Sequence, residues 1–122
     1  MLNIDNNHIK LTRGDTLRAE VSIMQQEDDC SLVPYEPQDG DAITFALKRN
    51  EYKGVRYTEL KDEQPLILKE IPTDTLMLDI EPEDTSGLGF GTYIYDIEIQ
   101  MADGTVDTFI ADAQFDIMTE VH

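Results

Sequence analysis

The chain of 122 residues has one cysteine, two histidines and no tryptophan. A single thiol, Cys30, excludes an internal disulfide and is compatible with synthesis in a reducing compartment. So few Cys and His residues make a zinc site built from those ligands unexpected. No apolar run approaches the roughly 18 residues that span a bilayer, and the N-terminus lacks the pattern of a signal peptide. We therefore expect neither membrane insertion nor secretion.

Positive charge is scarce. The chain has 26 Asp and Glu against 9 Lys and Arg, which gives a formal net charge of -17. Binding to a nucleic acid backbone is not expected, because that backbone attracts positive charge. The simplest interpretation of the acidic residues is solubility. A calcium-binding surface, a basic protein partner and mimicry of DNA remain as alternatives.

Residues for catalysis are also few. His8 opens a predicted strand and His122 is the last residue, so both are interpreted as surface histidines. Cys30 follows Glu27-Asp28-Asp29, and neighbouring carboxylates disfavour a reactive thiolate. No glycine-rich loop precedes a helix in the way that phosphate binding requires. The sequence therefore predicts no enzymatic activity and no cofactor.

What the sequence does contain is a repeated alternation of apolar and polar residues. It is clearest in residues 16–23, 43–48, 76–80 and 93–100, with shorter candidates at 8–11 and 66–71. A period of two with one polar face is typical of antiparallel sheets that are solvated on one side. Outward-facing residues such as Lys48, Asp96 and Glu98 are thus expected in solvent.

Turn residues separate these segments. Arg13-Gly14-Asp15 is interpreted as a turn between strands, although it also spells a cell-adhesion tripeptide. Asp103-Gly104 predicts a hairpin between 91–100 and 106–118. Within 106–118 the apolar parity changes, which predicts a β-bulge near Ala111-Asp112. Such a bend could let this strand serve two sheets.

Together these features predict an all-β, antiparallel β-sandwich of immunoglobulin-like architecture with about seven strands. One short helical turn is expected near 81–88, where Pro82 and acidic residues precede Gly87. Residues 25–40 and 49–64 are expected to be loops. The whole chain, 1–122, is predicted to be a single β-sandwich domain.

Two kinds of binding site can be drawn from the sequence. The loop at 49–57 concentrates basic and aromatic side chains, and its candidate partner surface is Arg49, Tyr52, Lys53, Arg56 and Tyr57. Aromatic residues and Arg are favoured at interface centres. An exposed hairpin tip with no partner is the simpler alternative. Calcium could be bound by acids that also suit turns and caps: Asp39 with Asp41, Glu81 with Glu83 and Asp84, and Asp103 with Asp107.

Four segments resemble, in order and spacing, the N-terminal domain of phage baseplate upper proteins, from tailed phages and prophages of Gram-positive bacteria. The segments are Leu11-Thr12-Arg13-Gly14-Asp15-Thr16, residues 39–48 from Asp39-Gly40-Asp41, residues 80–97 with Pro82-Glu83-Asp84-Thr85 and Gly91-Thr92-Tyr93, and Asp103-Gly104-Thr105-Val106-Asp107-Thr108. The resemblance spans about residues 8 to 121.

This resemblance implies a non-enzymatic structural or adaptor protein of the tail or baseplate, near the receptor-binding apparatus. Its partners would be other phage tail or baseplate proteins, and its location the virion, assembled in the host cytoplasm. In the family, further chain follows this domain and forms trimers. This sequence stops at His122, so a homo-oligomer is left open. The alternatives are an acidic DNA mimic that inhibits a host defence protein, and a carbohydrate- or calcium-binding module that uses Tyr35, Tyr52 or Tyr57.

Overall fold

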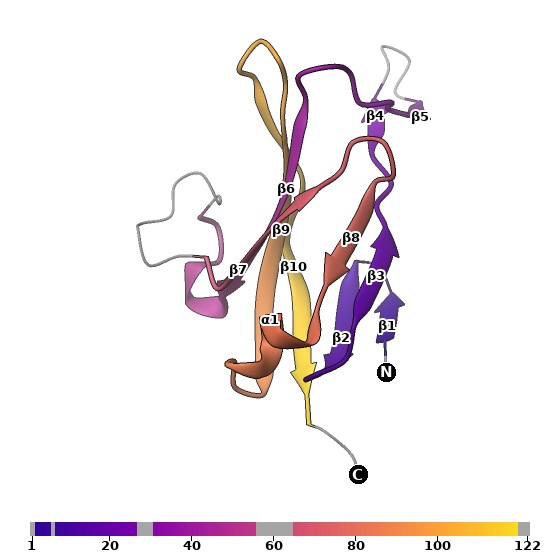
Figure 1. The fold of residues 1–122 in the computed structure, drawn as a ribbon. Helices are drawn as coiled ribbons and strands as arrows, with labels where there is room; N and C mark the ends of the chain where they lie inside the picture. Colours follow the sequence, from indigo (N-terminus) through magenta and orange to yellow (C-terminus); the bar gives the residue numbers. More distant parts are fainter. Residues whose placement is uncertain (1, 6, 27–30, 56–64, 120–122) are drawn as a thin grey trace.

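The computed structural model describes residues 2–5, 7–26, 31–55 and 65–119 (Figure 1). In this part of the chain almost all regular structure is extended. Its strands are β1 (Leu2–Asp5), β2 (His8–Thr12), β3 (Leu17–Glu20), β4 (Met24–Gln26), β5 (Leu32–Pro34), β6 (Ala42–Arg49), β7 (Ile67–Ile71), β8 (Met77–Ile80), β9 (Gly91–Gln100) and β10 (Val106–Met118). The helical elements of this part of the chain are a short 3-10 helix, η1 (Asn50–Tyr52), and the single-turn helix α1 (Pro82–Ser86).

The strands form an all-β sandwich. The larger sheet has the order β1-β2-β10-β9-β6-β7, and a two-stranded sheet, β3–β8, supplies the other side of the core. The β2–β10 pair is parallel, whereas the other pairs are antiparallel. The prediction of an all-β sandwich is confirmed. Among the described residues, no helix is long and apolar enough to cross a membrane.

Three details of the prediction were wrong. The described residues contain ten strands, not about seven. The segment 25–40 is not simply a loop, because β5 lies within it and pairs with β4. The segment 49–64 begins with the helical turn η1. The missed elements β1, β4, β5 and η1 are only three or four residues long, and alternation over so few residues carries little signal.

The apolar parity of the long strands builds the core. Phe45 of β6, Tyr95 of β9 and Phe115 of β10 are buried, and their ring centroids lie 5.2 to 6.2 Å apart. Tilted and edge-on aromatic pairs of this kind add about 0.5–1.5 kcal/mol each beyond their area. The Tyr95 hydroxyl donates to the Asn7 carbonyl, and burial raises the pKa of Tyr95 to about 12. The period-two signal thus identified the inward faces correctly.

Strand β10 contains the predicted irregularity. Its register against β9 shifts between Thr108 and Ile110 and again between Ile110 and Ala113. Asp112 lies within the second shift and has a φ of 52°. The predicted bulge near Ala111-Asp112 is therefore confirmed. The bend does not carry β10 into a second sheet, because β9 and β2 pair with its two edges within the same sheet.

At one end of the sandwich, α1 holds the turn between β2 and β3. The Gly14 N–H donates to the buried Thr85 hydroxyl at 3.1 Å, and the Arg13 guanidinium donates to the Leu88 carbonyl. The carboxylate of Asp84 accepts the Glu81 N–H, which completes a capping box, and pairs with Lys69 of β7 at 2.8 Å. The interpretation of Arg13-Gly14-Asp15 as a turn is confirmed (Figure 1).

At the opposite end, two Asp-Gly turns pack together. Gly40 has a φ of +90°, and a Cβ built on it would lie 2.7 Å from the Cβ of Ala102. A side chain at position 40 would therefore clash with the β9–β10 hairpin. The predicted hairpin is present, with Gly104 at a φ of +92° in its turn. Glycine is thus needed at position 40 for both backbone conformation and space.

Candidate partner-binding site

The outer face of the larger sheet differs from the predicted solvated face. Lys48, Asp96 and Glu98 point away from the core, yet all three are at most 4% exposed. Ala46 and Ile94 on the same face are buried too. The prediction that these polar residues lie in solvent was wrong, because β6 and β9 are covered on both faces.

The buried ammonium group of Lys48 has three acceptors. Its Nζ lies 2.6 Å from the Val55 carbonyl oxygen, 2.9 Å from Asp112 Oδ1 and 3.0 Å from Asp96 Oδ2. An ammonium group has three protons, so its donors are fully used. Such complete pairing is what burial of a charge requires.

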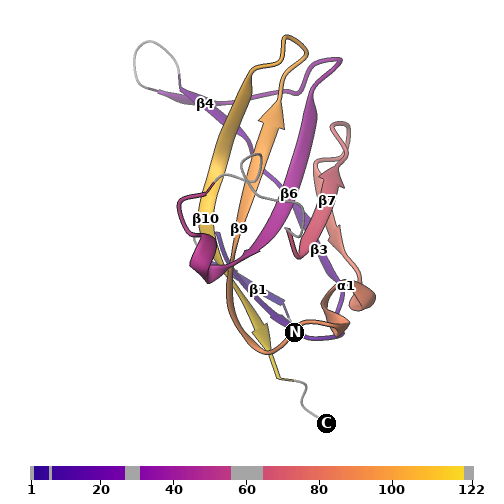
Figure 2. The same ribbon diagram turned by 90° about the vertical axis from the view of Figure 1, so that its left-hand side faces the viewer.

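This cluster also fixes the loop after β6. Asp112 Oδ2 accepts the Gly54 N–H at 2.9 Å, while the Asp112 N–H donates to Asp96 Oδ1 at 2.9 Å. The loop is therefore tied to β10 at Gly54, through the Asp112 carboxylate, and to β6 at Val55, through the Lys48 ammonium group. Figure 2 shows η1 lying in front of the sheet face near β9 and β10. A polar cluster on the sheet thus holds residues 50–55 in one arrangement.

Three of the five predicted partner-surface residues are described. Arg49 and Lys53 are exposed, and no ion pair involves either of them among the described residues. Tyr52 is half-buried. Arg56 and Tyr57 lie outside the described residues. The structure therefore presents two of the predicted cations on an anchored loop.

A shallow hollow of about 350 Å³ lies beside this loop. Arg49, Asn50 and Glu51 line one part of it, and residues 90–93 line the other. Phe90 is 49% exposed, and the Arg13 guanidinium carbon lies 4.2 Å from its ring centroid. Cation–π contact of this kind contributes about 0.5–1 kcal/mol at exposed sites. The hollow combines an exposed aromatic ring with cationic groups, a combination enriched at protein interfaces.

The acidic residues proposed as calcium ligands have other roles here. Hydrogen bonds from the main-chain N–H of Gln38, the Tyr35 hydroxyl and the main chain of Ala102 lower the pKa of Asp41. Hydrogen bonds from Thr105 lower the pKa of Asp103. Within the described residues, no group of three or more His, Cys, Asp or Glu is arranged to hold a metal. Turn and capping roles account for Asp41, Asp84 and Asp103.

His8 is half-buried rather than simply on the surface, and its Nε2 lies 2.9 Å from Asp116 Oδ2. His122 and Cys30 lie outside the described residues. Tyr35, one candidate for a sugar platform, packs against the core and donates to Asp41 at 2.7 Å.

Sequence reasoning missed Phe90 and the Lys48 cluster. Phe90 stands between Gly89 and Gly91, and an aromatic residue flanked by glycines could have been singled out as exposed. Lys48 and Asp96 had no comparable signal, because parity assigns a face of the sheet and does not say what covers it. Asp112 was found only as part of the bulge.

In comparisons with known proteins, no family model, no curated protein and no solved structure matches this chain.

Proposed function

We propose that this chain is a non-enzymatic structural or adaptor protein of a phage tail or baseplate, which mediates protein–protein assembly near the receptor-binding apparatus. The observation that carries the proposal is the resemblance of four segments to baseplate upper proteins. Those segments also meet in pairs in the fold. Residues 11–16 contact 80–88 through Gly14 and Thr85, and the turn at Gly40 packs on Ala102 beside the 103–108 segment.

The pairing is compatible with the proposal, since turns at the same end of a β-sandwich lie close together. Each pair closes one end of the sandwich with a specific requirement. One needs the hydroxyl of Thr85 as acceptor, and the other needs a residue without a side chain at position 40.

The partner surface of this adaptor would be the anchored loop with Arg49 and Lys53 and the adjoining hollow at Phe90. In a chain with a net charge of -17, the exposed Arg49 in one hollow with Phe90, and the exposed Lys53 on the same loop, favour an acidic patch on the partner. The loop is held by Lys48 and Asp112, so little conformational freedom is lost on binding.

Mass spectrometry of purified particles from a phage that encodes the chain tests the location. The chain is expected in stoichiometric amounts with the tail proteins. Its absence from purified particles, while it is abundant in the infected cell, would contradict the proposal.

Charge reversal tests the surface. Particles made with Arg49→Glu and Lys53→Glu together should incorporate the chain at least about tenfold less, at an unchanged melting temperature, because exposed substitutions change stability by about 0.5 kcal/mol or less. Lys10→Glu, an exposed reversal on β2, is the matched control and should incorporate normally. Equal incorporation of all three proteins would exclude this surface.

A further inference from the structure

Strand β3 has a hydrogen-bonded neighbour on one edge. It pairs with β8, and the Val21 N–H continues the ladder by donating to the Leu76 carbonyl at 2.7 Å. In an antiparallel ladder, residues alternate between facing the neighbour and facing away. Leu17, Ala19 and Val21 therefore use their main-chain groups toward β8.

The main-chain N–H and C=O groups of Arg18 and Glu20 point to the opposite edge. Over the described ranges, no backbone hydrogen bond reaches these groups. The smaller sheet consists of β3 and β8 alone, so the side of β3 that faces away from β8 is a sheet edge. An edge of this kind presents donors and acceptors two residues apart, which is the pattern that a further strand would pair with.

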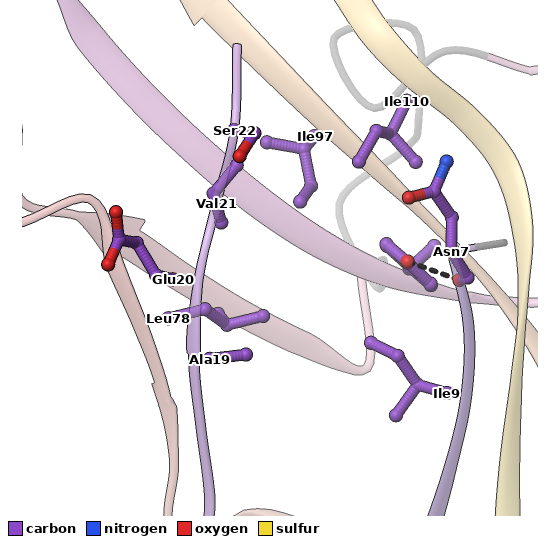
Figure 3. A pocket seen from close by; sticks show the side chains of 10 residues that line it. Asn7, Ile9, Ala19, Glu20, Val21, Ser22, Leu78, Ile97 and Ile110 are labelled. Carbon is purple, nitrogen blue, oxygen red and sulfur yellow. Dashed lines mark hydrogen bonds between the residues drawn. The ribbon is translucent and has the colours of Figure 1, made fainter. Parts of the chain in front are cut away.

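An apolar slot opens beside that edge. It has a volume of about 200 Å³ and lies between β3 and the start of β2. Figure 3 shows Ala19 and Val21 on one side, Ile9 on the other, and Ile97 and Ile110 behind them. A strand paired with β3 would direct every second side chain into this slot and the others to solvent.

The charges select the chemistry of the occupant. Glu20 is exposed and has no ion-pair partner among the described residues, whereas Arg18 on the same face of β3 pairs with Asp79 at 3.2 Å. A basic side chain on the solvent side of an added strand would lie beside the Glu20 carboxylate, and opposite charges across strands are favourable. A second copy of this chain is disfavoured, because each copy has a net charge of -17.

We propose that the free edge of β3 and the adjoining slot bind an extended strand of a partner protein in which apolar and basic residues alternate. The proposal rests on the proposed function as an assembly protein. It names a second contact, distinct from the Arg49 loop, and a mode of attachment in which the partner completes the smaller sheet.

Peptide titration of the intact protein tests this mode. The probe is a capped heptapeptide in which Lys and Val alternate. Its controls have the same residues in two blocks, or Glu in place of every Lys. The alternating basic peptide should bind at least about tenfold more tightly than either control, since only it matches both edge and charge. NMR should show slower amide exchange at Arg18 and Glu20 in the complex.

Two variants locate the contact. Glu20→Pro removes an outward N–H without removing a β8 hydrogen bond, and proline is tolerated on sheet edges. It should weaken binding about tenfold relative to Glu20→Ala, which keeps the N–H. Ala19→Leu, which fills the slot from β3, should also weaken binding and is the second test if Glu20→Pro does not fold.

Several results would overturn the proposal. These are no binding of the alternating peptide, binding that leaves the Arg18 and Glu20 amides unprotected, equal affinity for the three peptides, or a stable dimer of the chain alone. None of these results bears on whether the chain is present in virions, so failure here and failure of the proposed function are distinguishable.

Discussion

The ammonium group of Lys48 is 1% exposed and lies between two carboxylates. Removing it with Lys48→Met leaves Asp96 buried without a counter-charge. Breaking a buried pair from one side costs about 3–5 kcal/mol, so we expect a loss of that size in the free energy of unfolding. Urea denaturation measures it.

The double variant Lys48→Met with Asp96→Asn separates charge from packing. It removes the unpaired charge and keeps an oxygen for the Asp112 N–H, so it should be more stable than Lys48→Met alone. Lys69→Met is the comparison at a more exposed ion pair, with a loss of about 1 kcal/mol or less. A small effect of Lys48→Met would show that the cluster contributes little.

The carboxylate of Asp116 makes a pH-dependent contribution to the free energy of unfolding. Burial would raise its pKa, but hydrogen bonds from Gln114, His8 and Thr92 outweigh burial and lower the pKa. Because the folded pKa lies below the unfolded value of about 3.9, the contribution is present above that pH and is lost as the pH falls through the folded value. Urea denaturation of wild type and Asp116→Asn from pH 5 to pH 2 should show their difference shrinking toward acid. A difference that grows toward acid would mean that folding raises the pKa of Asp116 instead of lowering it.

At the scale of elements, the alternation of residues was enough to find β6, β8, β9 and β10 and their inward faces. The bulge could be predicted because its parity change is encoded locally around Asp112. The burial of Lys48 and Asp96 and the anchoring of the loop at Gly54 and Val55 could not, since they depend on contacts among Lys48, Asp96 and Asp112, which are far apart in the sequence. Candidate loop residues were therefore found, while the cluster that anchors them was not.

The contact between α1 and the β2–β3 turn depends on one buried hydroxyl. Thr85→Val keeps the shape of the side chain but leaves the Gly14 N–H without its acceptor. We expect a loss of about 1–2 kcal/mol in the free energy of unfolding. Amide exchange at Gly14 should become faster.

Ser86→Ala is the matched control for that variant. The Ser86 hydroxyl donates to the Glu83 carbonyl, just as the Thr85 hydroxyl donates to the Pro82 carbonyl, but Ser86 is exposed and water can replace its bond. Its effect should stay within about 0.5 kcal/mol. Equal losses for the two variants would mean that the contact with Gly14 contributes nothing specific.

At the scale of the whole molecule, the net charge of -17 acts against the compact state. Salt screens this repulsion, because the Debye length falls from about 30 Å at 0.01 M to about 3 Å at 1 M ionic strength. The Lys48 cluster is buried and is screened much less. The melting temperature should therefore rise with NaCl, by about 4 °C for each kcal/mol of repulsion removed.

The same measurement separates general screening from specific calcium binding. Turn and cap roles occupy Asp41, Asp84 and Asp103, so CaCl₂ and MgCl₂ at equal ionic strength should raise the melting temperature equally. An additional rise with CaCl₂ that saturates with concentration would instead indicate a calcium site. A fall in melting temperature with NaCl would mean that attractive ion pairs outweigh the repulsion, and the acidic surface would then be stabilising rather than merely solvating.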